Sequence, residues 1–165
     1  MPFDFDPCHS HNVFLTDFRS TLKSLIAERQ KIECLSLKFV AIAFSKNAGS
    51  TAKEKNLIAI HEYNNVTGEI KMPAISKLHN GTVSDDILFA PDDSYLIISD
   101  QGNHAVNFHS FDKTSGTLEN DYFFQLKNPE AKLSFNHGMG LSTNKKYLAV
   151  ANYGTDTCNI YQIAQ

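Results

Sequence analysis

Two stretches of the sequence repeat each other and decide the fold. Residues 85–111 read DDILFAPDDSYLIISDQGNHAVNFHSF, and residues 137–163 read HGMGLSTNKKYLAVANYGTDTCNIYQI. They align without a gap at an offset of 52 residues, so that Tyr95 falls on Tyr147 and Gly102 on Gly154. Few residues are identical, but the residue classes agree along the whole length. Each unit reads as strand, polar turn, strand, glycine turn and strand, and we expect both glycines to supply a positive φ angle in a tight turn.

A weaker third copy lies upstream. Residues 60–68, IHEYNNVTG, are similar to residues 108–116, FHSFDKTSG, and the preceding residues read as a buried strand over 35–44 and a second strand over 57–63. A period near 50 residues with about four strands per unit is typical of a β-propeller blade. The sequence therefore predicts an all-β fold, a partial β-propeller of about three blades over 35–80, 81–133 and 134–165, with the last blade missing its outer strand.

The first 34 residues have a different pattern and form an N-terminal extension. Between residues 17 and 32, apolar side chains recur at helical spacing with charged residues between them, which predicts one amphipathic helix over 17–32. Its apolar stripe either packs on the sheets that follow or binds a partner, and the pattern alone leaves both open.

The repeat resembles a known family. Residues 86–103 are similar to the blade motif of lactonase-type seven-bladed β-propellers (6-phosphogluconolactonase-like, with YVTN-like repeats), in which an apolar strand is followed by Ser-Pro-Asp-Gly-Lys, a Tyr-Leu strand and Asn-x-Gly. Residues 137–154 match it again, with Thr143-Asn144-Lys145-Lys146 in place of the expected turn, and residues 111–118 resemble that family's linker between strands. The resemblance implies a seven-bladed propeller and, in some members, hydrolysis of sugar-phosphate lactones.

Three blades are too few to close a propeller, which takes roughly four to eight. An open stack would leave apolar faces exposed at its ends. The sequence leaves three explanations open: a truncated remnant of a longer chain, assembly with a second copy or a second chain that completes the propeller, or an open array capped by the N-terminal helix. The expected partners are thus another protein chain and, if a site exists, a small-molecule lactone.

The candidate site lies where the first strand of a blade begins, because this strand borders the central channel of a propeller. His137 opens the last blade and is the candidate catalytic base, since histidine titrates near neutral pH. Asp85 is its equivalent one blade earlier, and Asp100 and Asn152 end the second strands on the same side; these three are the candidate ligand-binding residues. In the family that the chain resembles, a histidine at this position is part of the funnel lining. The alternative is that Asp100 and Asn152 only hydrogen-bond their own turns and that His137 is structural.

Composition excludes several other functions. A net charge of −3 gives no basic surface for nucleic acid or an anionic membrane. The start of the chain lacks a signal-peptide pattern, and three widely spaced cysteines form no disulfide framework, so we expect a cytoplasmic protein. Cys8-His9-Ser10-His11 matches no zinc spacing, and we expect neither a metal nor a cofactor.

Two functions remain after these exclusions. One is a lactonase-like propeller protein that could be a fragment of a sugar-lactone hydrolase. In that case we expect the isolated chain to be inactive. The other is a non-enzymatic module that binds proteins through its propeller faces. The only arginines, Arg19 and Arg29, lie in the expected helix, so no arginine is placed in the funnel to hold an anionic substrate.

Overall fold

A computed structural model describes residues 30–35, 38–44, 56–64, 66–79, 83–90, 92–127, 131–142 and 144–163. It is built of antiparallel strands with one short 3₁₀ helix among these residues. In this part of the chain, no helix is long and apolar enough to cross a membrane.

The strands form three antiparallel sheets in the described part of the chain, each made of strands that follow one another in sequence. The first sheet contains β1 (Gln30–Leu35), β2 (Phe39–Phe44), β3 (Leu57–Glu62) and β4 (Ser76–His79). The second contains β5 (Ile87–Phe89), β6 (Tyr95–Asp100), β7 (Ala105–Asp112) and β8 (Thr117–Lys127). The third contains β9 (Asn136–Leu141), β10 (Tyr147–Asn152) and β11 (Thr157–Gln162), with the 3₁₀ helix η1 (Tyr153–Thr155) between the last two.

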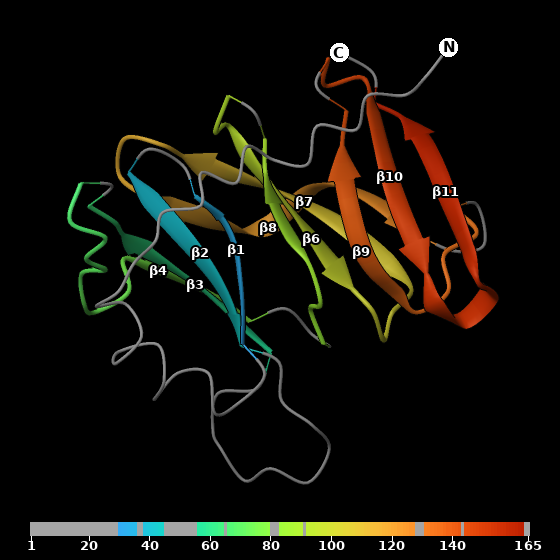
Figure 1. Ribbon diagram of the computed structural model, residues 1–165, viewed down its shortest axis with the longest axis horizontal. Coiled ribbons are helices and arrows are strands. Elements are labelled where there is room, and N and C mark those ends of the chain that lie inside the picture. Colours follow the sequence, from blue (N-terminus) through green and yellow to red (C-terminus); the bar gives the residue numbers. More distant parts are fainter. Residues whose placement is uncertain are drawn as a thin grey trace, which may run out of the picture.

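The sheets stack side by side like the blades of a propeller (Figure 1). Their first strands are neighbours, because β1 lies against β5 and β5 against β9, and the outer strands β4 and β8 also touch. The prediction of an all-β fold with the architecture of a partial propeller is therefore confirmed.

The repeat at an offset of 52 residues holds in the backbone as well as in the sequence. Tyr95 opens β6 and Tyr147 opens β10, and each carbonyl accepts a hydrogen bond from the equivalent residue of the preceding turn, Ala90 at 2.8 Å and Ser142 at 2.9 Å. The turns match although their sequences differ. Asp92 and Asn144 each use the side-chain oxygen Oδ1 to accept the backbone N–H two residues later, a local bond that aspartate and asparagine make readily.

Left-handed backbone also recurs at equivalent positions, but not at the glycines where we expected it. Among the described residues with positive φ are His104 at 52° and Asp156 at 50°, each directly before the third strand of its sheet. Gly102 and Gly154 are not among them, so that prediction was wrong. Gly154 is needed for space instead: a Cβ there would overlap the Oγ of Ser134 and lie 3.0 Å from the Phe135 ring.

Two further expectations fail near the start of the described region. The stretch 35–44 is not one strand, because β1 pairs antiparallel with β2 and Leu35 lies opposite Val40. The stretch is largely apolar, and the exposed Lys38 lies between the two strands. Residues 30–32 were expected to end the helix but belong to β1, so the first sheet begins five residues before the predicted boundary at 35. The rest of the predicted helix, 17–29, lies outside the described residues.

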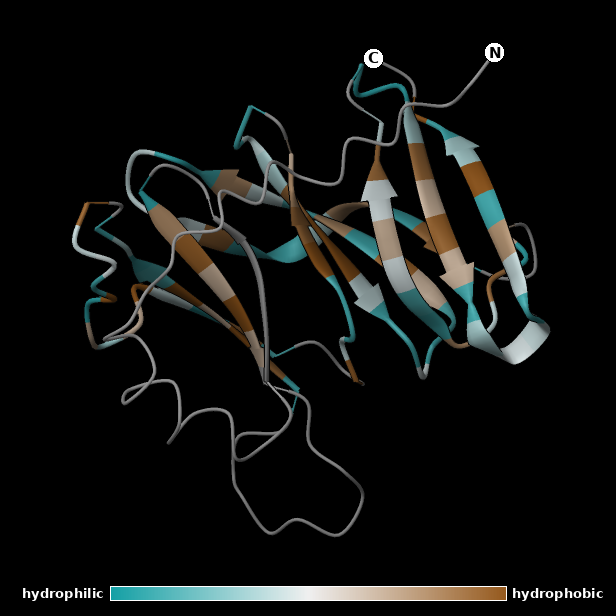
Figure 2. Ribbon diagram, in the orientation of Figure 1, coloured by the Kyte–Doolittle hydropathy of each residue, from teal (hydrophilic) through white to brown (hydrophobic). Residues whose placement is uncertain are grey.

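The strands are rich in apolar residues (Figure 2), and buried apolar side chains form clusters between the sheets. One cluster joins the first and second sheets, with Phe39, Phe89 and Phe111 in edge-to-face ring contacts at its centre. A second cluster joins the second and third sheets: Leu88, Ile97, Val106 and Phe108 on one side and Leu148 and Val150 on the other. Each face of the second sheet is thus covered by a neighbouring sheet, which positions the ends of β5 and β9 beside each other.

Candidate functional site

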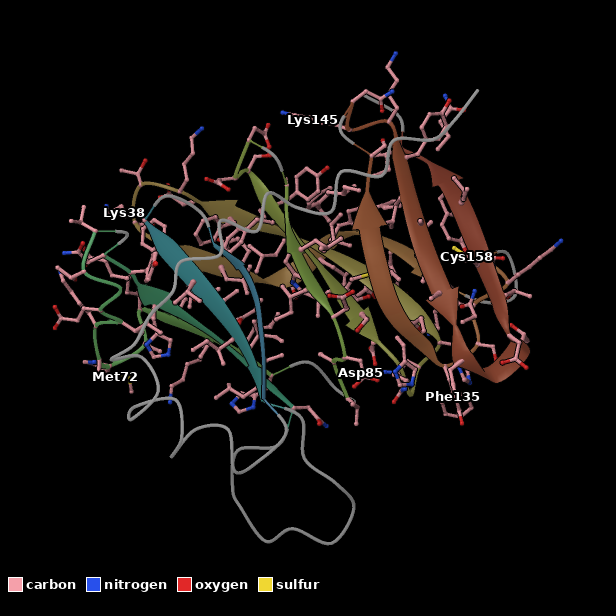
Figure 3. The ribbon with its side chains drawn as sticks, in the orientation of Figure 1. Lys38, Met72, Asp85, Phe135, Lys145 and Cys158 are labelled. Carbon is pink, nitrogen blue, oxygen red and sulfur yellow. The ribbon has the colours of Figure 1, made fainter. Side chains whose placement is uncertain are left out.

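The structure brings His137 and Asp85 together. Asp85 lies two residues before β5, and His137 is the second residue of β9, so the stacking of these first strands places the two residues side by side. His137 Nδ1 lies 3.3 Å from Asp85 Oδ2. The histidine side chain is half exposed and the aspartate is 25% exposed, so the pair is open to solvent on one side. Figure 3 shows Asp85 at the end of the sheets that also carries Phe135.

Asp85 is held in place through its backbone. The Oγ of Ser99, which is fully buried in β6, accepts the backbone N–H of both Asp85 and Asp86 at 2.9 Å. The side chain of Asp86 in turn accepts the backbone N–H of Met139 in the third sheet. This last bond ties the start of β5 to β9 and so fixes the spacing between Asp85 and His137.

Two residues that we did not predict complete the surroundings of His137. The amide nitrogen Nε2 of Gln101 lies 2.7 Å from His137 Nε2, and the ring of Tyr153 lies 5.3 Å from the imidazole, centroid to centroid. Gln101 and Tyr153 are themselves repeat equivalents, 52 residues apart. The site therefore consists of two equivalent pairs, and the second pair lies in the aligned repeat one residue beyond Asp100 and Asn152.

The donor and acceptor roles at His137 Nε2 depend on the tautomer of the imidazole and on the orientation of the Gln101 amide. With the Gln101 amide nitrogen as donor, His137 Nε2 must be the acceptor, so the ring is neutral and carries its proton on Nδ1. That proton is directed at the Asp85 carboxylate. A half-turn of the Gln101 amide would present its oxygen to Nε2 instead, which suits a ring protonated on both nitrogens.

Asp100 and Asn152 lie at equivalent strand ends but are turned inward. They are 4% and 2% exposed. Asp100 accepts a hydrogen bond from the Asn103 side chain at 2.9 Å. Asn152 Oδ1 accepts the backbone N–H of Ser134 at 3.1 Å, and its amide group lies near Val150 O and Thr157 Oγ1. Both side chains thus hold the turns beside the His137–Asp85 pair. None of these hydrogen bonds joins Asp100 or Asn152 to His137 or Asp85.

Aromatic side chains border the site on its solvent side. Tyr153 is 73% exposed and Phe135 is 48% exposed, and the backbone N–H of Tyr153 bonds to the carbonyl of Phe135 at 3.1 Å. The His104 ring packs edge-on against Phe135 at 5.0 Å, while its Nδ1 accepts the backbone N–H of that residue. The rim therefore offers flat apolar surface next to a histidine and a carboxylate.

The described part of the chain contains no cluster of three or more metal-ligating side chains. The Cys8–His11 stretch lies outside it. The site is accordingly built from an acid–base pair, an amide and aromatic rings, a set of groups that can hydrogen-bond a polar ligand and move a proton.

The sequence matches no protein-family model and no curated protein. Solved structures do resemble the fold. A candidate 6-phosphogluconolactonase of Bacteroides fragilis superposes with a TM-score of 0.61 at 22% identity, over 83% of this chain and 35% of that one. The periplasmic gluconolactonase of Pseudomonas aeruginosa gives 0.61 at 14% identity, over 76% and 36%.

A chain of the mitotic checkpoint complex, which is not a lactonase by its name, also superposes, with a TM-score of 0.55 at 13% identity over 79% of this chain and 34% of that one. At these identities the comparisons show the fold alone, which is that of part of a β-propeller. The chain spans about a third of the length of these structures.

Proposed function

We propose that this chain carries a hydrolytic site for a sugar lactone, with His137 as general base. The observation that carries the proposal is the His137–Asp85 contact at 3.3 Å on an open rim. A carboxylate at Nδ1 orients an imidazole and stabilises the imidazolium that forms when Nε2 takes a proton. The likeness in fold to two structures named as lactonases supports the choice of substrate class.

The reaction needs one water and no redox partner. His137 Nε2 removes a proton from water as its oxygen attacks the carbonyl carbon of the lactone, and negative charge collects on the carbonyl oxygen. The ring C–O bond then breaks, and the leaving alkoxide takes the proton back from the imidazolium. The product is the open-chain hydroxy acid, and the histidine returns to its starting state.

Gln101 has a positioning role in this scheme. Its amide occupies His137 Nε2 at 2.7 Å, so it must move aside when the attacking water binds. Once displaced, the same amide N–H can donate to the oxyanion that develops on the lactone. Tyr153, exposed beside the imidazole, offers a flat surface on which a sugar ring can lie.

Charge favours an unphosphorylated lactone. The carboxylates Asp85, Asp86 and Asp100 gather around the start of β5 and the end of β6, and a phosphate near them would be repelled.

The test uses the full chain and glucono-δ-lactone, with the spontaneous hydrolysis rate subtracted. His137→Ala should remove the catalysed rate, and Asp85→Asn should lower it. His79→Ala, a change at an exposed histidine of β4, is the matched control and should retain the rate. Folding is checked by urea unfolding, where a rim substitution should cost less than about 1 kcal/mol. The proposal fails if His137→Ala retains the rate, or if the wild-type chain neither hydrolyses the lactone nor shifts the NMR signals of His137 in its presence.

A second function, binding of a protein partner without catalysis, is favoured by one observation. Phe135 and Tyr153 stand exposed on the rim, and such aromatic side chains are frequent anchors of protein interfaces. In that case Tyr153→Ala and Phe135→Ala would abolish partner binding while His137→Ala would not, the reverse of what the hydrolase predicts.

A further inference from the structure

Two neighbouring residues on the rim, His104 and Phe135, have left-handed backbone although neither is glycine. Their φ angles are 52° and 44°. This conformation is unfavourable for a bulky residue and persists only where the surrounding contacts enforce it. His104 lies directly before β7 and Phe135 directly before β9, at the end of the sheets that also carries Asp85 (Figure 3).

The imidazole of His104 is one of the groups that enforce the conformation of Phe135. His104 Nδ1 accepts the backbone N–H of Phe135 at 3.1 Å, and the two rings pack edge to face with their centroids 5.0 Å apart. A ring nitrogen that accepts a hydrogen bond carries no proton, so His104 is neutral and holds its proton on Nε2. The next residue, Asn136, donates its side-chain amide to the carbonyl of Ala105 at 3.0 Å. Because that bond already ties β9 to β7, the His104 bond acts on the orientation of the Phe135 backbone.

Phe135 passes this constraint on to Tyr153. The carbonyl of Phe135 accepts the backbone N–H of Tyr153 at 3.1 Å, and the carbonyl of Ser134 accepts that of Gly154 at the same distance. The Tyr153 ring lies 5.3 Å from the imidazole of His137. A relaxation of Phe135 to an ordinary φ angle would turn its carbonyl away from Tyr153 and so release the turn that carries the ring beside His137.

His104 is also bonded to the turn on the other side of the imidazole. Its backbone N–H donates to the carbonyl of Gln101 at 3.2 Å. Gln101 in turn places its amide nitrogen 2.7 Å from His137 Nε2. His104 is therefore connected to both residues that flank the imidazole of His137, to Gln101 directly and to Tyr153 through Phe135.

We propose that His104 is a positioning residue of the site. Its unprotonated Nδ1 holds Phe135 in the left-handed conformation and thereby keeps Tyr153 beside the imidazole of His137. The turn by itself does not require a histidine, because the repeat equivalent Asp156 has the same left-handed backbone with φ at 50°. The effect of His104 on a reaction rate rests on the proposed lactone hydrolysis, whereas its effect on the arrangement of the rings can be measured without substrate.

The test compares two substitutions of His104 that both tolerate left-handed backbone. His104→Gly removes the acceptor. His104→Asn keeps one, because the asparagine Oδ1 can take the place of Nδ1 and asparagine is enriched at positive φ. Asp93→Gly is the matched control: Asp93 has φ at 57° in the turn before β6, at the opposite end of that strand from the site. All three variants should unfold at nearly the urea concentration of wild type.

Two readouts are taken on the full chain. Without substrate, the NMR signals of the His137 imidazole and the Tyr153 ring should move in His104→Gly and stay near wild type in His104→Asn and Asp93→Gly. The asparagine variant also lacks the His104 ring, so it separates the hydrogen bond from ring-current effects. With glucono-δ-lactone, His104→Gly should lower kcat/KM by about tenfold or more, since a small misplacement of site groups is costly to the rate. His104→Asn should retain most of it.

The outcomes separate this proposal from the hydrolase itself. A wild-type chain that does not hydrolyse the lactone contradicts the proposed function, and the NMR comparison then decides the role of His104 alone. The positioning role is overturned if His104→Gly leaves the signals of His137 and Tyr153 in place, or if His104→Asn fails to restore them. It is also overturned if His104→Gly unfolds the chain, which would make His104 purely structural, or retains the full kcat/KM of an active wild type.

Discussion

The second and third sheets share one repeat and differ in their surroundings. β6 and β10 begin with a tyrosine at equivalent positions and run through apolar residues to a buried polar one, and their turns have matching hydrogen bonds. Among the described residues, the second sheet is covered on both faces, whereas the third is covered on one. The same local sequence pattern therefore gives the same strands, but burial of each position depends on the neighbour that the sheet has.

The largest expected effect contrasts Phe108 with its equivalent, Ile160. Phe108 is 3% exposed and packs between the sheets, whereas Ile160 is 61% exposed. Phe108→Ala should lower the free energy of unfolding by about 3–5 kcal/mol, because it leaves a cavity in a packed core. Ile160→Ala should change it by less than about 0.5 kcal/mol in dilute, monomeric protein. Urea unfolding measures both, and equal losses at the two positions would mean that the third sheet is not open.

A smaller effect distinguishes two glycines within the third sheet. Gly154→Ala should lower the free energy of unfolding by about 1–3 kcal/mol, because the new methyl group would overlap Ser134 and force the turn at η1 to move. Gly140→Ala meets open space and should be neutral or stabilise by up to about 1 kcal/mol, since alanine restricts the unfolded chain. The comparison is made by thermal and urea unfolding. A destabilising Gly140→Ala would show that other atoms already cover this side of the third sheet.

The smallest effect at neutral pH comes from the equivalent pair His109 and Tyr161. His109 Nδ1 contacts the carbonyl of Glu119 on β8, and burial lowers the pKa of this imidazole below its ordinary 6.5. The unfolded chain therefore takes up the proton more readily, so stability should be full above about pH 6.5 and fall as the pH drops below it. His109→Gln should flatten that acid limb.

Tyr161, which hydrogen-bonds the carbonyl of Ala131, should act at the opposite end of the pH scale. Burial raises its pKa above 10, so its contribution is present below pH 10 and lost as the pH rises further. Tyr161→Phe should flatten the alkaline limb. Urea midpoints measured from pH 4 to 11 for both variants test the pair, and an acid limb that persists in His109→Gln would assign it to other groups.

The local structure followed from the sequence wherever it depends on neighbouring residues. Alternating apolar residues give strands, and aspartate or asparagine at position 92 or 144 forms the turn, so the alignment of residues 85–111 with 137–163 was enough to predict two sheets of the same build. The reversal between Leu35 and Val40 was missed for the same reason, since an apolar run has no period that separates one buried strand from two.

The candidate site could be predicted in part. The pairing of His137 with Asp85 follows from equivalent strand starts in adjacent blades, but Gln101 and Tyr153 were not singled out because neither residue type suggests chemistry by itself. The inward turn of Asp100 and Asn152 was one of two alternatives, and their hydrogen bonds to the turns were visible only in the structure.

By itself, the sequence determined the class of fold, the limits of the repeat and the position of the histidine and aspartate at the strand starts, because these depend on residue type and spacing. Only the tertiary structure decided which side chains are covered, which way a strand-end carboxylate turns and where an apolar face stays open. Those properties depend on the packing of one sheet against another. The strands β6 and β10 have similar sequences but differ in burial, because the second sheet packs against a described sheet on each face and the third sheet packs against one.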